Sequence, residues 1–403
     1  MEYSRQTAEY LVDRFGSPLY VFDEEGFIKN YRDLETAMRS RYENYRISYS
    51  FKTNYTPYIC SVVKRLGGYA EVVSGMEYAI ARKVGFDDKH IIFNGPDKGE
   101  ESEEAFLNGC MIHADSLDEL GRLCAAARKH PEKSFRIGLR IHLNIADGFV
   151  SRFGMDDADA EEAFRIVSST DNLIISGLHC HISRCRSVEA WKKRTEHMLA
   201  LADRLFAGAP DYIDLGSGMF GSMAPELASQ FDEVPSYDDY SQVTAALFAE
   251  HYRSGQGPRL FTEPGTTLIN RFVDCITEVR AIKQLSGHSF AVLNASEHNL
   301  GETCRLKRLP LRVIPRGEDR GEYEHLDLTG YTCLEQDVLY PGYSGSLGIG
   351  DFVVFENTGG YSNVLKPPFI RPNCAMAARN TDGQYVLIKS AETCEDILRT
   401  YVF

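Results

Sequence analysis

The chain has 403 residues and a formal net charge of −14 at pH 7. This length is too great for one typical hydrophobic core and predicts about two domains. The negative charge argues against a nucleic-acid partner, because phosphate binding requires basic patches. The sequence contains no run of about 18 apolar residues, so we expect neither a membrane-spanning helix nor a membrane partner.

The cysteine pattern and the first residues bear on location and redox state. The chain has 10 cysteines, none of them in a CxxC pair, which argues against a zinc site or a disulfide framework. The first twenty residues carry charges throughout and do not resemble a secretory signal. We therefore expect a cytoplasmic protein with mostly reduced thiols and no bound metal.

The chain begins with a predicted short helix, Thr7–Phe15, and a strand, Leu19–Phe22. Strand and helix signals then alternate with a regular rhythm, and short runs that are apolar on both faces predict eight buried strands. These runs are Ile47–Phe51, Tyr69–Val73, Ile91–Phe93, Met111–Ala114, Phe135–Leu143, Leu173–His179, Tyr212–Leu215 and Leu260–Thr262.

Helix signals separate the predicted strands. Thr56-Pro57 predicts a helix start with threonine as the N-cap. Ser74-Gly75-Met76-Glu77 and Ser116-Leu117-Asp118-Glu119 have the capping-box pattern and each predict a further helix. Other helices are expected at Glu100–Asn108, Asp157–Val167, Glu189–Phe206, Tyr237–Tyr252 and Thr267–Phe272.

Eight consecutive strand–helix units match a closed (β/α)8 barrel better than an open sheet. After Phe272 the rhythm changes to short β-like runs separated by turn residues, such as Phe352–Phe355 and Tyr385–Lys389. This pattern indicates a β-rich second domain. We expect the barrel to span residues 24–272, and the β-rich domain to combine residues 1–23 with residues 273–403.

Lys52 is the most informative residue, because it stands at the end of the first predicted barrel strand. A lysine held there can form a Schiff base with a carbonyl cofactor or substrate. Functional groups of barrel proteins gather at the carboxyl ends of the strands. His181, Ser183 and Glu263 also follow strand ends, so we expect all four residues to open onto one face.

The segment Gly216-Ser217-Gly218 follows the seventh predicted strand and has the composition of a phosphate cradle. Phosphate sites in barrels often lie after strands seven and eight. Glycines also allow backbone N–H groups to approach an anion. Together with Lys52 and a late pair, Cys333 and Tyr361, this segment predicts a pyridoxal 5'-phosphate (PLP) enzyme.

Each of these features has an ordinary structural explanation when taken alone. A lysine at a strand end is usually a solvated charge, and a Gly-Ser-Gly segment is usually a turn. His181 would most often be a satisfied polar residue, Glu263 a cap or ion-pair partner, Cys333 an inert thiol and Tyr361 a packed aromatic. The placement of so many candidates at one barrel mouth favours the functional interpretation.

Several segments occur in an order that is typical of one enzyme family. They are Tyr49-Ser50-Phe51-Lys52-Thr53-Asn54, Glu71-Val72-Val73-Ser74-Gly75-Met76-Glu77, Ser151-Arg152-Phe153-Gly154, Gly177-Leu178-His179-Cys180-His181-Ile182, Gly216-Ser217-Gly218, Glu263-Pro264-Gly265, Cys333 with Asp337, and Gly359-Gly360-Tyr361. With these segments the sequence resembles the fold-type III PLP-dependent decarboxylases, the family of diaminopimelate and ornithine decarboxylases. The resemblance extends from about Pro18 to about Pro372 and implies an alanine racemase-like fold, a barrel plus a C-terminal β-rich domain.

The resemblance implies a role for each matching residue. Lys52 would carry the PLP, His181 would stack on its pyridine ring, and Glu263 would contact the ring nitrogen. The remaining cofactor contacts implied are Glu71, Ser183, Gly216, Ser217, Gly218, Gly265, Thr266 and Tyr361.

A second group of residues is expected at the substrate. The resemblance implies a head-to-tail homodimer with shared active sites, in which Cys333 reaches the partner subunit's site and serves as the proton donor. Leu334, Glu335 and Asp337 would then face a small amino-acid substrate.

The sequence also departs from the family pattern. Thr266 stands where the family has an arginine after Glu-Pro-Gly, so the phosphate lacks a cationic partner that the Thr266 and Thr267 hydroxyls would only partly replace. Ser183 follows Ile182 without the family's intervening glycine. Leu334 stands where diaminopimelate and ornithine decarboxylases have an acid that pairs with the distal ammonium of the substrate.

These departures lead to the hypothesis of a decarboxylase that acts on a specialised or modified amino acid, rather than on meso-diaminopimelate or L-ornithine. Two alternatives remain open. One is a PLP-dependent racemase or epimerase on the same barrel, against which Glu263 argues, since racemases of this fold usually place an arginine near the pyridine nitrogen. The other is a non-catalytic homologue.

Overall fold

The computed structural model describes residues 1–145, 150–183, 185–252 and 257–403. The chain divides into two compact units with different architectures: one is a closed barrel and the other is built on a large sheet. The barrel unit consists of Asn30–Gly221 and Glu233–Thr267, and the sheet unit consists of Met1–Lys29, Ser222–Asp232 and Leu268–Phe403.

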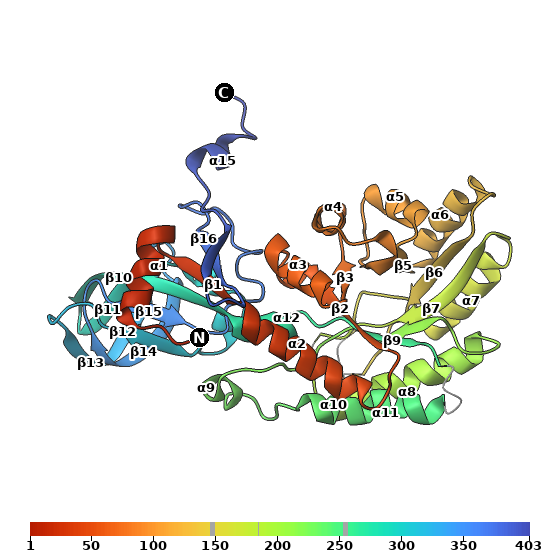
Figure 1. Ribbon diagram of the computed structural model, residues 1–403, viewed down its shortest axis with the longest axis horizontal. Helices are drawn as coiled ribbons and strands as arrows, with labels where there is room; N and C mark the ends of the chain where they lie inside the picture. Colours follow the sequence, from red (N-terminus) through yellow and green to blue (C-terminus); the bar gives the residue numbers. More distant parts are fainter. Residues whose placement is uncertain (146–149, 184, 253–256) are drawn as a thin grey trace. The chain divides into compact units, whose positions relative to one another are not determined.

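Among the residues that the structure describes, eight parallel strands close into a ring (Figure 1). The last strand pairs in parallel with the first, with Leu260 opposite Tyr45, and this pairing closes the barrel. The expected (β/α)8 barrel is therefore confirmed. The strands are β2 (Tyr45–Ser50), β3 (Tyr69–Val72), β4 (Ile91–Phe93), β5 (Met111–Ala114), β6 (Phe135–Arg140), β7 (Leu173–His179), β8 (Tyr212–Asp214) and β9 (Arg259–Thr262).

The α-helices alternate with the barrel strands and lie outside the ring (Figure 1), and two short 3-10 turns lie at the ends of strands. Their buried faces pack on strands that are themselves buried almost throughout, as expected for a covered parallel sheet. The helices are α2 (Glu24–Arg39), η1 (Phe51–Thr53), α3 (Pro57–Arg65), α4 (Gly75–Val84), η2 (Asp88–His90), α5 (Glu101–Asn108), α6 (Leu117–Arg128), α7 (Asp157–Val167), α8 (Val188–Leu205), α10 (Tyr237–Val243) and α11 (Ala245–His251).

Helix starts in the barrel follow the predicted capping signals closely. The Ser74 hydroxyl accepts a hydrogen bond from the Glu77 N–H (3.3 Å), while the Glu77 carboxylate accepts from the N–H of Val73 (2.8 Å). The Ser116–Glu119 pair repeats the arrangement. Thr56 is the N-cap residue of α3 as predicted, although its hydroxyl makes no cap hydrogen bond and donates to the Asn54 side chain at 2.7 Å.

The structure differs from the expectation at three elements. The helix α2 was not predicted, although its buried residues Phe27, Tyr31, Leu34 and Met38 follow the helical period. The single helix expected over Tyr237–Tyr252 is divided at Thr244 into α10 and α11. The first barrel strand ends at Ser50, so Lys52 lies in the 3-10 turn η1 and not in the strand.

In the described part of the second unit, a nine-stranded sheet has the order β14-β13-β11-β10-β1-β16-β17, with β15 pairing with both β10 and β12. The N-terminal strand β1 thus lies between two strands from the C-terminal third of the chain. The predicted β-rich character of this region is confirmed. The strands are β1 (Leu19–Asp23), β10 (Val273–Leu285), β11 (His288–Leu293), β12 (Leu311–Ile314), β13 (Gly321–Thr329), β14 (Val338–Leu347), β15 (Phe352–Phe355), β16 (Ala375–Arg379) and β17 (Tyr385–Lys389).

A core of apolar residues lies under this sheet, where Leu11 packs with Leu19, Val21, Ile276 and Phe352. No helix in the described ranges is long and apolar enough to cross a bilayer. The remaining helices are α1 (Arg5–Phe15), α9 (Pro225–Ala228), α12 (Thr266–Ile269), η3 (Asn270–Phe272), α13 (Glu297–Leu300), α14 (Thr303–Leu306) and α15 (Cys394–Leu398).

Candidate active site

Lys52 is held at the carboxyl end of the barrel by a buried carboxylate. Its Nζ donates to the Ser50 hydroxyl at 3.0 Å and to Glu71 Oε2, and the Ser50 hydroxyl donates to the same carboxylate. The Lys52 side chain is 29% exposed, whereas that of Glu71 is 1% exposed. The amine is therefore oriented by the protein and still open to a ligand.

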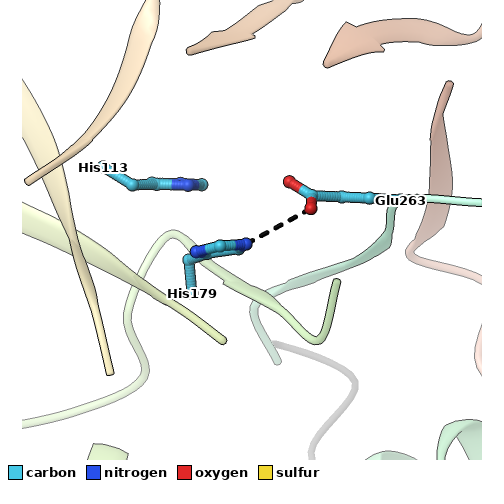
Figure 2. Close-up of side chains that lie close together, drawn as sticks. All are labelled: His113, His179 and Glu263. Atoms are coloured by element: carbon cyan, nitrogen blue, oxygen red, sulfur yellow. Dashed lines mark hydrogen bonds and ion pairs between the residues drawn. The ribbon is translucent and has the colours of Figure 1, made fainter. Parts of the chain in front are cut away.

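Glu263 follows β9 and is also buried. Its Oε1 accepts from the side-chain amide of Asn94 at 2.5 Å, and its Oε2 lies 3.3 Å from His179 Nε2 (Figure 2). The same Asn94 amide donates to Glu71 Oε1 at 3.1 Å. One asparagine thus connects the carboxylate beside Lys52 with the carboxylate expected at the pyridine nitrogen.

The two carboxylates fix the orientation of Asn94, and Asn94 in turn fixes the tautomer of His113. Because the Asn94 amide nitrogen serves two carboxylates, its Oδ1 must accept, so the His113 Nδ1 at 2.6 Å carries the proton. The His113 Nε2 then accepts from the Tyr212 hydroxyl at 3.0 Å. The chain of hydrogen bonds therefore runs in one direction, from Tyr212 through His113 and Asn94 to Glu263.

The imidazoles of His113 and His179 are stacked, with 4.7 Å between ring centroids and 13° between ring planes (Figure 2). Burial lowers the pKa of both rings well below the usual value for histidine, so both are neutral near pH 7. His113, His179 and Glu263 place one ligand atom each within 4.8 Å of the others. Since both nitrogens of His113 already make hydrogen bonds, we interpret the group as part of the network and not as a metal centre.

His181 follows β7 and accepts a hydrogen bond from the Ser217 N–H at its Nδ1 (3.2 Å). Burial lowers the pKa of His181 well below its usual value. A neutral ring whose Nδ1 accepts an N–H does not form an ion pair with Glu263 Oε2, although the two atoms lie 3.8 Å apart. His181 is therefore a neutral imidazole at the barrel mouth.

The Gly216-Ser217-Gly218 loop packs backbone to backbone against the loop after β7. Gly216 has φ +62° and Gly218 has φ +102°, values that favour glycine. A Cβ on Gly216 would collide with the Cys180 carbonyl oxygen, and one on Gly218 with that of Ile182. The close approach of the two loops explains the glycines without any ligand. The N–H groups of Gly216 and Ser217 donate to Asp214 (2.8 Å) and His181 (3.2 Å), so the Gly218 N–H is the one that the loop can offer to an anion.

Gly265 and Thr266 follow Glu263 at the end of β9. Gly265 is buried, and Thr266 is half-buried at the start of α12. The neighbouring Thr267 hydroxyl donates to the Met219 carbonyl oxygen at 2.9 Å. The expectation that Thr267 offers its hydroxyl proton to a phosphate is therefore wrong, because that proton is already used.

Sequence reasoning missed Asn94, His113 and Arg194 and gave Asp214 no role of its own, although all four are buried. Asn94 directly follows a predicted strand, as Glu263 does, and this position was the signal available for it. Asp214 ends β8 in the structure, one residue before the predicted end. Burial raises the pKa of Asp214 well above its usual value, and the adjacent Glu263 charge raises it further. Arg194 lies on the apolar face of α8, where an arginine is unusual.

Cys333, Leu334 and Glu335 lie in the sheet unit, between β13 and β14. Cys333 and Glu335 are exposed and Leu334 is half-buried. In the same unit, Tyr361 is half-buried and has φ +56°, a left-handed conformation that is uncommon for a residue with a side chain. Their roles at the substrate and the cofactor stay predictions.

Asp337 has an evident local role in the same segment. It is buried, and its carboxylate accepts hydrogen bonds from the Thr332 N–H at 3.1 Å, the Thr332 hydroxyl at 2.6 Å and the Glu297 N–H at 2.8 Å. These bonds brace the segment that carries Cys333. The expected contact between Asp337 and a substrate stays a prediction.

Comparison with known proteins identifies the family. The family model described as "Pyridoxal-dependent decarboxylase, pyridoxal binding domain" matches residues 28–270. The chain belongs to this family. It is a PLP-dependent amino-acid decarboxylase, a carboxy-lyase, and its cofactor is PLP.

Relatives and solved structures agree with this assignment. Diaminopimelate decarboxylase from Aquifex aeolicus is 28% identical over 96% of this chain and 92% of its own length. The L-glutamyl-[BtrI acyl-carrier protein] decarboxylase of Niallia circulans is 26% identical over 97% of this chain and 95% of its own. Among solved structures, diaminopimelate decarboxylase from M. jannaschii in complex with L-lysine has a TM-score of 0.85 at 22% identity, covering 98% of this chain and 94% of that one.

The residues at the barrel mouth fit PLP. Lys52 offers an oriented amine for the aldehyde, Glu263 a buried carboxylate for the ring nitrogen, and His181 a neutral ring. The loop Gly216-Ser217-Gly218 offers the N–H group of Gly218 for the phosphate, since those of Gly216 and Ser217 already donate to side chains. These groups follow β2, β7, β8 and β9, so the residues that fit PLP all lie at the mouth of the barrel.

Proposed function

We propose that this decarboxylase acts on a specialised or modified amino acid, and that meso-diaminopimelate and L-ornithine are not its substrates. The observation that carries the proposal is Leu334, directly after Cys333. The resemblance places an acid there in diaminopimelate and ornithine decarboxylases. An acid pairs with a distal ammonium group, whereas leucine offers only apolar surface.

The Niallia circulans relative supports the proposal of a specialised or modified substrate. It is named for a glutamyl group on an acyl-carrier protein, so the relatives of this chain include an enzyme whose named substrate is not a free diamino acid. Its identity to this chain, 26%, is close to the 28% of the diaminopimelate decarboxylase from Aquifex aeolicus. The similarity therefore gives little preference to either substrate class, and Leu334 favours the second.

In the proposed reaction each residue at the barrel mouth has one task. PLP, when bound, supplies the electron sink for the electron pair left on Cα. Lys52 holds the cofactor covalently, and Glu263 favours the protonated ring nitrogen because a carboxylate stabilises that cation. His181 lies against the ring and Glu71 orients Lys52. Ser183, Thr266 and Tyr361 complete the cofactor contacts.

We further propose that the enzyme is a cytoplasmic homodimer. Cys333 of one subunit then donates a proton to Cα in the other subunit's site, and Leu334 and Glu335 contact the distal end of the substrate. Support for this comes from the exposure of Cys333 and Glu335 in the sheet unit, since a residue that serves a partner's site must be accessible.

The substrate proposal is tested with a panel of amino acids and aminoacyl carrier proteins, measuring released carbon dioxide in the presence of PLP. Rapid turnover of meso-diaminopimelate or L-ornithine would contradict it. Leu334→Asp sharpens the test, because restoring an acid should raise turnover of these diamino acids by about tenfold or more. Gln336→Asp, which adds the same charge at an exposed position of the same segment, should not.

The role of Cys333 is tested separately. We expect Cys333→Ala to keep the visible absorption of the bound cofactor while lowering correct product formation by about tenfold or more. Cys394→Ala removes another exposed thiol and serves as the control. Loss of absorption in Cys333→Ala would mean that the cysteine belongs to the cofactor site instead. Exchange of the Cα proton without loss of carbon dioxide would favour a racemase.

A further inference from the structure

Arg194 is a buried cation without a carboxylate partner. Its side chain on α8 is fully buried, and no acidic group pairs with it among residues 1–145, 150–183, 185–252 and 257–403. Its Nη1 donates to the Leu215 and Ser217 carbonyl oxygens, both at 2.8 Å, and its Nη2 to the Ile182 carbonyl oxygen at 3.0 Å. The guanidinium group also lies 4.1 Å from the centre of the Trp191 ring.

These bonds orient the two loops that meet at the barrel mouth. In a trans peptide group the C=O and the following N–H point in opposite directions. Because the carbonyls of Ile182 and Ser217 point at Arg194, the N–H groups of Ser183 and Gly218 point away from it. Neither N–H has a hydrogen-bond acceptor within the described part of the chain.

The two N–H groups also belong to loops in direct contact. A Cβ on Gly218 would collide with the Ile182 carbonyl oxygen and would lie 3.5 Å from the Ser183 Cα. Two adjacent backbone donors that face away from a buried cation form a site for an anion. The positive charge of Arg194, which lies behind these N–H groups, polarises both peptide groups and strengthens their attraction for the anion.

We propose that Arg194 is a positioning residue for the phosphate of PLP. It does not contact the phosphate but orients the Ser183 and Gly218 N–H groups toward it and supplies the positive charge behind them. The inference rests on the PLP site described above. It also accounts for the buried charge itself, because a guanidinium group stays protonated and its burial is costly without a counter-charge. The phosphate dianion, one peptide group away, is that counter-charge.

A purely structural role for Arg194 would be to tie the loops together by hydrogen bonds. Two variants separate the roles. Arg194→Gln keeps neutral N–H donors but removes the charge, and Arg194→Lys keeps the charge with a different shape. Arg259→Gln is the matched control, because Arg259 is a half-buried arginine that contacts the Tyr69 and Phe261 rings at the start of β9, at the other end of the barrel.

The experiment measures the dissociation constants of PLP and of pyridoxal, which lacks the phosphate, for protein freed of cofactor. We expect Arg194→Gln to weaken PLP binding by about 10- to 100-fold, the loss typical of a charge-assisted interaction, and to change pyridoxal binding by less than about threefold. Arg194→Lys and Arg259→Gln should keep the preference for PLP within about threefold of the native protein.

Two results would overturn the proposal. One is an equal loss of PLP and pyridoxal affinity in Arg194→Gln, which would assign Arg194 to loop structure alone. The other is loss of the preference for PLP in Arg194→Lys, and this variant decides alone if Arg194→Gln does not fold, as judged by circular dichroism. A native protein that binds neither compound would instead contradict the PLP site.

Discussion

The two ends of the barrel are made by the same eight strands, but the charged side chains compared here are buried at one end and exposed at the other. At the carboxyl end, Glu71 and Glu263 are each 1% exposed and are joined through Asn94. At the amino end, the ion pair between Arg136 and Asp211 joins side chains that are 60% and 53% exposed. One end buries its charges in a hydrogen-bonded network, and the other leaves them in water.

The difference shows at which end of the barrel the burial of charged groups costs folding free energy. Buried carboxylates cost free energy unless donors surround them, whereas an exposed ion pair costs and contributes little. A set of buried ionisable groups at one barrel mouth is typical of an active site. Substitutions at the carboxyl end should therefore affect chemistry, and those at the amino end should affect stability or nothing.

The largest effect is expected for Lys52→Ala. Removal of the amine eliminates the covalent attachment of PLP, so decarboxylation should fall by about 10³-fold or more. The visible absorption of the bound cofactor should disappear, and borohydride reduction followed by peptide mass spectrometry should no longer label this segment. The control is Lys64→Ala, which removes an exposed lysine on α3. Retained absorption in Lys52→Ala would refute the assignment of the cofactor lysine.

A smaller effect is expected for Asn94→Leu, which removes the amide shared by the two carboxylates. Both lose a donor, so kcat should fall by about tenfold, and the free energy of unfolding should fall by about 1.5–3 kcal/mol. Asn172→Leu is the matched control at the amino end, where this amide donates to the carbonyl oxygens of residues 127, 130 and 133. Asn172→Leu should lower the free energy of unfolding and leave kcat unchanged. An equal loss of kcat in both variants would contradict the functional difference between the two ends of the barrel.

The pH dependence of stability tests Glu77 at the start of α4. Burial raises its pKa to about 7, so the folded state prefers the protonated carboxyl. Its contribution is complete below the unfolded pKa, near 4.5, and is lost as the pH rises through 7. Glu77→Gln should therefore be more stable than the native protein at pH 8, by about 1–3 kcal/mol, and equally stable near pH 4. Urea unfolding at both pH values measures this, and a variant less stable at pH 8 would contradict it.

The smallest effect is expected for Asp211→Asn at the amino end. The ion pair with Arg136 is exposed, and such pairs contribute at most about 1 kcal/mol, with a median near zero. The variant should keep kcat within about twofold and shift the urea midpoint only slightly. A loss of activity here comparable to that of Asn94→Leu would show that the two ends do not differ in function.

Much of the site was predictable because its residues follow strand ends. Lys52, His181, the Gly216–Gly218 loop and Glu263 each come directly after a buried apolar run, and parallel strands in a barrel bring such positions to one mouth. The positions of Cys333 and Tyr361 relative to the cofactor were not predictable in this way, since no regular period connects a β-rich unit to a barrel.

Asn94, His113 and Arg194 escaped prediction for a different reason. Each acts through contacts with residues distant in the sequence, such as the bond between Asn94 and Glu263 across 169 positions. The neighbours of His113 in sequence are apolar and indicate only burial, and Arg194 stands among charged residues that indicate an exposed helix face. The role of a buried polar residue depends on the groups with which it forms hydrogen bonds.

The sequence by itself determined the order of the strands and helices, the closed barrel and the glycine and lysine positions at its mouth, because these depend on local period, capping and turn chemistry. Only the tertiary structure decided which buried polar groups meet, which way Asn94 and His113 are oriented, and that the cation at Arg194 lies behind the loops. Those outcomes depend on hydrogen bonds between segments far apart in the chain, which no local pattern contains.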